Sequence, residues 1–126
     1  METIKRISFY CLLIACSLAL FGCGKKADEN KPISEVKAEA EQMNTSQLRS
    51  TAMKYKEAIL AKKSEIEKLN NKLMSIPAAE MLGAEAKEIT NEITNLSESA
   101  AALTERFKIY YNKLKEKGGD LSGLEL

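Results

Sequence analysis

The sequence predicts an all-α protein built around a long antiparallel coiled-coil hairpin of two helices. Residues 33–76 contain neither Gly nor Pro and are rich in Ala, Glu, Lys, Gln, Met and Leu, which favour helices. Apolar residues recur at heptad spacing in two long segments, one on each side of Pro77. The two segments carry opposite net charges. We therefore expect them to pack side by side in opposite directions.

The N-terminus has the pattern of an export signal. Lys5 and Arg6 precede an apolar segment at residues 7–21, and Gly22 follows it. Those 15 residues would span about 22 Å as a helix, whereas the hydrocarbon core of a membrane is about 30 Å thick. A charged start, a short apolar core and a small residue before the cut are typical of a secretory signal peptide. We predict that residues 1–22 are a cleaved signal rather than a membrane span.

Leu20-Phe21-Gly22-Cys23 resembles the lipid-attachment signal of bacterial lipoproteins. The resemblance implies that the signal is removed before Cys23, which then carries the lipid. Leu13-Ile14-Ala15-Cys16 can be interpreted in the same way, so Cys16 is the alternative. Cys23 is preferred because it lets the whole apolar segment serve as the signal. The resemblance ends at Cys23 and implies an envelope location: the periplasmic side of the outer membrane in a Gram-negative bacterium, or the cell surface in a Gram-positive one.

After Cys23 the sequence predicts a flexible polar linker that ends at residue 32. The first helix is expected over residues 33–75, although Asn44-Thr45-Ser46 could end one helix and cap another. Eight of the ten heptad positions of this segment are apolar. The ten positions are Thr45, Leu48, Ala52, Tyr55, Ile59, Lys62, Ile66, Leu69, Leu73 and Ile76.

Pro77 is suited to the first turn of a new helix, because the N–H group it lacks has no partner there. The second helix is expected over residues 78–117, and Gly83 can delay its regular start. Its ten heptad positions are all apolar: Leu82, Ala86, Ile89, Ile93, Leu96, Ala100, Leu103, Phe107, Tyr110 and Leu114. Gly118 can end the helix in a left-handed cap, and residues 118–126 form a tail.

Charge favours the pairing of these two helices. Residues 49–72 contain seven basic and three acidic side chains, whereas residues 80–105 contain six acidic and one basic. The outer ends match as well, with a net charge of −3 over residues 28–41 and +4 over residues 106–117. A turn at Pro77 brings these opposite charges together. Two helices alone bury little surface, so the hairpin could also dimerise into a four-helix bundle.

The composition favours no catalytic chemistry. The chain has no His or Trp, and no phosphate-binding loop is present. Glu85, Glu88 and Glu92 share a helix face, but this pattern is typical of a solvated surface rather than a metal site. The full chain has 19 basic and 18 acidic residues. Loss of the predicted signal peptide removes Lys5, Arg6 and Glu2, so the chain that begins at Cys23 has 17 basic and 17 acidic side chains. We expect no enzyme activity, no metal, no cofactor beyond the covalent lipid and no nucleic-acid partner.

Several apolar residues outside the two seams are candidates for partner binding, among them Leu60, Ile109 and Tyr111. The leading hypothesis is a non-enzymatic, lipid-anchored envelope protein that acts as a helical spacer, adaptor or protein-interaction module. Its expected partners are the membrane, through the lipid, and a second copy of the chain or another envelope protein. The alternative is a small lipidated inhibitor or immunity-type regulator that binds an envelope enzyme or toxin.

Overall fold

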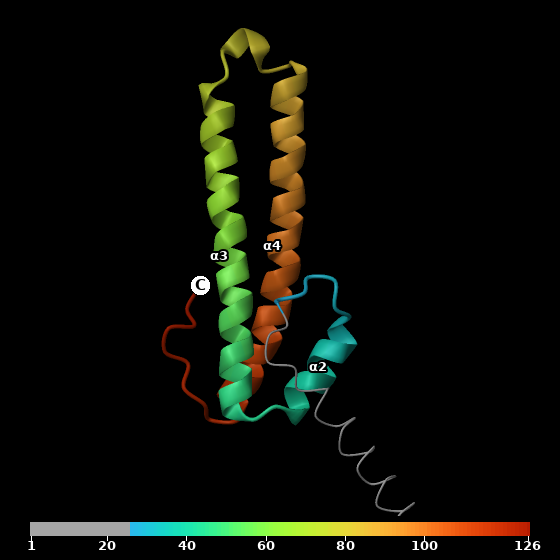
Figure 1. The fold of residues 1–126 in the computed structure, drawn as a ribbon, viewed down its shortest axis with the longest axis vertical. Coiled ribbons are helices and arrows are strands. Elements are labelled where there is room, and N and C mark those ends of the chain that lie inside the picture. Colours follow the sequence, from blue (N-terminus) through green and yellow to red (C-terminus); the bar gives the residue numbers. More distant parts are fainter. Residues whose placement is uncertain (1–25) are drawn as a thin grey trace, which may run out of the picture.

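The structure, a computed structural model, describes residues 26–126. These residues form helices α2 (Ile33–Gln42), α3 (Thr45–Ser75) and α4 (Ala84–Glu116), with a 3₁₀ turn, η2 (Ala78–Glu80), between α3 and α4. No strand occurs in this range, which confirms the predicted all-α class. Helices α3 and α4 lie side by side in opposite directions, and α2 lies beside the far end of α4 (Figure 1). The predicted signal peptide and both candidate lipid-attachment residues, Cys16 and Cys23, lie outside the described residues.

Three names describe the parts of the molecule. The base comprises residues 26–59 and 100–126, and the arm comprises residues 60–99. The tip is the end of the arm, residues 74–82, where α3 connects to α4. None of the helices between residues 26 and 126 is both long enough and apolar enough to cross a membrane.

The single helix expected over residues 33–75 is divided into α2 and α3. Met43 leaves the helical conformation, with φ −78° and ψ 143°, and Asn44 caps α3. The Asn44 side chain accepts a hydrogen bond from the Gln47 backbone N–H at 2.8 Å, and the Gln47 side chain accepts one from the Asn44 N–H at 3.0 Å. This reciprocal capping box satisfies two N–H groups that a helix start leaves without partners. The break lets α2 turn back and pack against α4.

The helix expected over residues 78–117 begins later, at Ala84. Pro77 opens the short turn η2 instead, and Gly83 precedes the first residue of α4. At the other end, Gly118 adopts a left-handed conformation with φ 70°. Its N–H donates to the Lys115 carbonyl at 3.1 Å, and the Gly119 N–H donates to the Leu114 carbonyl at 2.9 Å. These two bonds end α4 in a Schellman motif and direct the tail back along α3.

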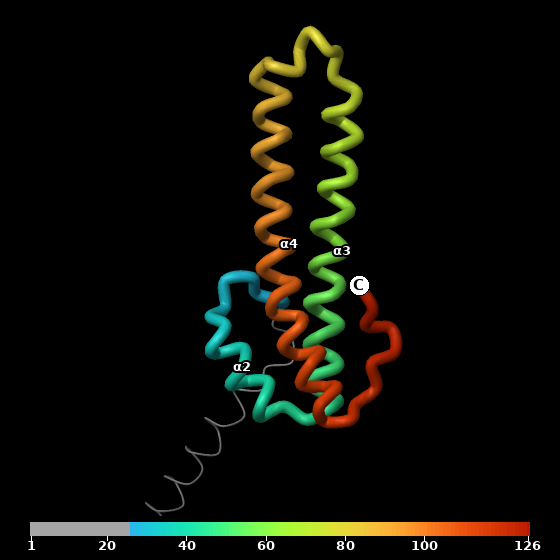
Figure 2. Tube along the Cα trace, turned by 180° about the vertical axis from the view of Figure 1, so that it is seen from behind, coloured from blue at the N-terminus to red at the C-terminus, as the bar shows by residue number. Residues whose placement is uncertain are grey.

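The core lies in the base, where four segments meet. The linker and α2 pack on one side of the helix pair, and the tail packs on the other (Figures 1 and 2). Helix α2, both long helices and the tail contribute buried apolar side chains to this cluster: Val36, Ala40, Leu48, Ala52, Tyr55, Ile59, Leu103, Phe107, Tyr110, Leu114 and Leu124. Each of these is at most 4% exposed.

The arm is different, because among residues 26–126 only α3, α4 and the connecting turn η2 are present there. Ala86 and Ile89 are buried and Leu82 is exposed, whereas the other apolar seam positions of the arm are half-buried: Ile66, Leu69, Leu73, Ile76, Ile93 and Leu96. Burial of apolar area is the main favourable term in folding. The stabilisation of this fold is therefore concentrated in the base.

Candidate functional site

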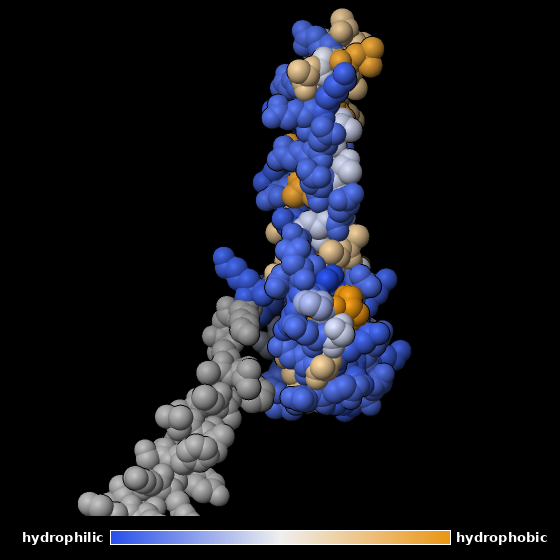
Figure 3. Space-filling view, turned by 90° about the vertical axis from the view of Figure 1, so that its right-hand side faces the viewer, coloured by the Kyte–Doolittle hydropathy of each residue, from blue (hydrophilic) through white to orange (hydrophobic). Residues whose placement is uncertain are grey.

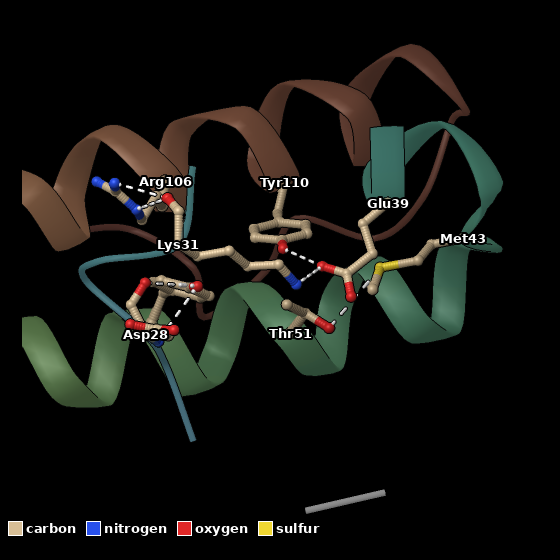
Figure 4. Close-up of polar contacts among 8 residues, drawn as sticks. Asp28, Lys31, Glu39, Met43, Thr51, Arg106 and Tyr110 are labelled. Atoms are coloured by element: carbon tan, nitrogen blue, oxygen red, sulfur yellow. Dashed lines mark hydrogen bonds and ion pairs between the residues drawn. The ribbon is translucent and has the colours of Figure 1, made fainter. Parts of the chain in front are cut away.

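The described part of the linker, residues 26–32, is held firmly on the base (Figure 4). The Tyr55 hydroxyl donates to the Asp28 carbonyl at 3.1 Å and accepts from the Asp28 N–H at 3.3 Å. Ser99 on α4 donates a hydrogen bond to the Glu29 carboxylate. The sequence predicts a flexible tether here, but residues 26–32 follow a path that contacts with α3 and α4 determine.

Arg106 joins the linker to α4 from a buried position, at 8% exposure. Its Nε and Nη2 atoms donate to the Lys31 carbonyl at 2.9 and 2.7 Å, and Nη1 donates to the Ala102 carbonyl at 2.8 Å. A buried charge is costly unless hydrogen bonds replace those it made to water. Three bonds to carbonyl oxygens meet this requirement, and they fix the chain direction at Lys31.

A second polar group links α2 to α4 (Figure 4). The Tyr110 hydroxyl donates to the Glu39 carboxylate at 2.9 Å, and the Lys31 ammonium pairs with the same carboxylate. The Tyr110 ring lies 5.4 Å from the ring of Tyr55. Burial, and then the hydrogen bond to Glu39, raises the pKa of Tyr110. Burial likewise raises the pKa of Tyr55. Both hydroxyls therefore remain protonated donors well above neutral pH.

The raised pKa of Tyr110 predicts loss of stability in alkali. Below about pH 10, the ordinary pKa of tyrosine, Tyr110 is protonated in the folded and unfolded states alike. Above that pH the unfolded chain ionises at Tyr110 while the folded chain resists, so the free energy of unfolding falls. Urea unfolding should show Tyr110→Phe to be about 1 kcal/mol less stable at neutral pH, through loss of one hydrogen bond. The variant should also lose less stability than the wild type above pH 10. Equal alkaline losses would contradict the assignment.

Charged side chains tie the end of α4 to the end of α2. Lys113 pairs with Glu41 at 2.5 Å and with Glu116 at 2.7 Å. The Lys117 ammonium donates to the carbonyls of Glu41 at 3.0 Å and Met43 at 2.6 Å. The hydrogen bond to Lys113 lowers the pKa of Glu41. These contacts agree with the opposite charges of residues 28–41 and 106–117.

The surface outside the core carries two groups of exposed apolar side chains. The first is at the tip, where Met74 is 76%, Met81 42% and Leu82 86% exposed. The second comprises Leu60 on α3 and Leu126 at the C-terminus, which are 45% and 49% exposed; the C-terminus lies beside α3 (Figure 1). Figure 3 shows hydrophobic atoms gathered at the tip of an arm that is otherwise largely hydrophilic. Large exposed apolar groups of this kind are typical of surfaces that bind a partner.

The three predicted partner-binding residues have different environments. Leu60 is exposed on α3, but Ile109 and Tyr111 are half-buried and pack against the core. The Tyr111 ring lies 5.7 Å from that of Phe107, which is buried.

Sequence reasoning placed Leu82 in the buried seam, and this is wrong. Because α4 begins at Ala84, Leu82 precedes the helix and does not share its buried face. Met74 was missed altogether. The available signal was the presence of apolar residues both before and after Pro77, in a turn that connects two charged helices.

The described residues contain no group of three or more His, Cys, Asp or Glu side chains positioned to hold a metal ion. No family model matches the sequence, and searches of curated proteins and of solved structures found no significant match.

Proposed function

We propose that this protein is a non-enzymatic, lipid-anchored protein of the bacterial cell envelope, in which the helical arm acts as a spacer and interaction module. Lipid on Cys23 would attach the base to the membrane. The observation that carries the proposal is the separation of two features: a linker bound to the base, and exposed apolar side chains on the arm.

Geometry supports a spacer role. The chain is bound to the base from Asp28 onward, so few residues separate Cys23 from a rigid body. Helix α4 contains 33 residues, which correspond to a length of about 50 Å, and it runs through the base and along the arm towards the tip. A short link to the membrane and a rigid helix pair would hold the tip at a defined distance from the anchor.

The character of the exposed residues supports an interaction role. Met74 and Met81 at the tip have flexible, polarisable side chains, which adapt to irregular apolar surfaces. They lie at the end of the molecule opposite α2 (Figure 1). An apolar group at the end of a charged arm is expected to be covered by another surface when the protein works.

The anchor is tested by fatty-acid labelling in a bacterium that processes lipoproteins. Cys23→Ala should abolish labelling and shift the protein from the membrane fraction to the soluble fraction. Cys16→Ala is the matched control and should leave both unchanged. Loss of label in Cys16→Ala alone would move the anchor to Cys16, and absence of label from the wild type would refute lipid anchoring.

A further inference from the structure

We propose that residues 26–43, which we name the strap, open as one unit while α3, α4 and the tail stay folded, and that this opening lengthens the tether between the lipid and the base. The strap comprises the described part of the linker, helix α2 and Met43. The inference rests on the proposed anchor at Cys23 and adds a second, extended state to it.

The first step is the order of the contacts between the strap and α4. The two segments run in the same direction, and Figure 4 shows the middle of the series. From the linker end, the contacts are Glu29 with Ser99, the Lys31 carbonyl with Arg106, Glu39 with Tyr110, Glu41 with Lys113, and the Met43 carbonyl with Lys117. The lipid would pull on the linker end. Tension therefore loads these contacts one after another, starting at Glu29, rather than all together.

The second step is that the strap is held largely through polar groups. Of the eleven buried core residues named above, two, Val36 and Ala40, belong to the strap. Arg106 is a buried charge whose three bonds go to carbonyl oxygens, and two of these bonds go to Lys31. When the strap opens, water replaces the Lys31 carbonyl, and the desolvation cost of the guanidinium falls. Polar contacts of this kind are typical of interfaces that open and close.

The third step is that α3 begins independently of α2. The capping box of Asn44 and Gln47 satisfies the start of α3 with residues that lie outside the strap. Met43, with its extended backbone, separates the two helices. Helix α2 has ten residues, which is too few for a stable helix in isolation. Once it leaves α4, the strap therefore becomes an unfolded tether, whereas α3 keeps its cap.

The fourth step is that α2 packs against α4 but stands away from α3. Among residues 26–126, an open groove of about 1020 Å³ lies between α2 and α3. Its two walls include Glu35, Ala38 and Gln42 from α2, and Ser46, Ser50 and Lys54 from α3. A segment that is packed along one side has fewer contacts to lose, so it opens at a lower free energy than the helix pair.

Opening changes how far the base can stand from the membrane. In the closed state, the five residues from Cys23 to the bound Asp28 span at most about 17 Å. In the open state, the 21 residues from Cys23 to Asn44 span up to about 70 Å. The strap thus stores tether length that the protein can release without losing its lipid.

Native-state hydrogen exchange, followed by NMR, tests whether the strap opens separately. Residues 24–126 carry no lipid and include every residue that the structure describes. The amides of Val36 and Ala40 in α2 should share one opening equilibrium and be at least about tenfold less protected than the Leu103 amide in α4. Equal protection of all three amides would overturn the proposal, because the strap would then open only when the whole fold unfolds.

Two arginine variants provide the matched control. Arg49 binds the tail, on the other side of the helix pair, through two carbonyls at 2.7 Å, and these bonds persist when the strap opens. Arg49→Met should therefore lower the protection of Leu103 severalfold and leave that of Val36 unchanged. Arg106→Met removes the bonds to Lys31 and should lower the protection of both amides at least about tenfold. Equal losses at Val36 and Leu103 in Arg49→Met would refute a separate strap.

Single-molecule pulling tests the extension. One handle is attached to the N-terminus of residues 24–126, and the other to Glu57→Cys, an exposed position on α3 in a chain that has no other cysteine. The first transition should release residues 26–43 and lengthen the molecule by at most about 60 Å, before α3 yields. A first transition that already includes α3 would show that the strap and the helix pair open together.

The two proposals fail separately. A chain that is labelled with fatty acid at Cys23, but whose strap opens only with the whole fold, would refute the strap and leave the anchor intact. A strap that opens separately in a protein without label would refute the anchor, and with it the tether role, but not the opening itself.

Discussion

Replacing Leu103 by Ala should lower the free energy of unfolding by about 3 kcal/mol, whereas the same change at Leu96 should lower it by about 1 kcal/mol. The two leucines occupy equivalent heptad positions on α4, one heptad apart. Leu103 is 2% exposed within the four-segment core of the base, but Leu96 is half-buried in the arm. Removal of a side chain costs more where rigid neighbours surround the space it leaves.

Urea unfolding followed by circular dichroism measures both changes, at a protein concentration where the wild type is monomeric. Each variant serves as the control for the other, because the chemical change and the helix are identical. Equal losses would show that stability is spread evenly along α3 and α4. A larger loss at Leu96 would place the main core in the arm, against the burial seen in the structure.

Arg106→Met should cost about 2–3 kcal/mol and release the linker from the base. The substitution keeps much of the side-chain volume but removes all three hydrogen bonds, which leaves the Lys31 and Ala102 carbonyls without these donors. Loss of the donors to Lys31 should free the preceding residues as well. Hydrogen exchange of the Asp28 N–H, which is bonded to Tyr55, reports this release.

Two controls sharpen the Arg106 test. Lys108→Met removes a positive charge from an exposed position on the same helix and should be nearly neutral. Arg106→Lys keeps the charge but lacks the planar guanidinium that reaches two carbonyls, so it should behave more like Arg106→Met than like the wild type. A stable Lys variant with a protected Asp28 amide would show that charge alone holds the linker.

Local features of the sequence predicted the main elements of the fold. Heptad spacing marked both long helices, and Pro77 marked the connection between them. Gly118 marked the end of α4, because a residue without a side chain adopts the left-handed conformation readily. Asn44 marked a possible break, because its short polar side chain can cap a helix start. Each of these signals acts within a few residues of its position.

The candidate site was predicted only in part. Leu60 was identified as an exposed apolar residue outside the seam, and it is one. Ile109 and Tyr111 have the same sequence character but pack against the core of the base. No local signal separates these cases, because the difference depends on which distant segment lies above each residue.

The sequence by itself therefore determined the two long helical segments and most of the residues that share the face between α3 and α4, but not the separate helix α2 or the start of α4 at Ala84. The tertiary structure alone decided how well that face is covered. Leu96 and Leu103 are equivalent in periodicity, yet only Leu103 lies where α2, the linker and the tail gather around the helix pair. Heptad periodicity predicts which face of a helix a residue lies on. Whether that residue is buried depends on further segments, distant in the sequence, that pack over it. In the arm no segment of residues 26–126 fills that place, so the side chains between α3 and α4 there stay partly exposed.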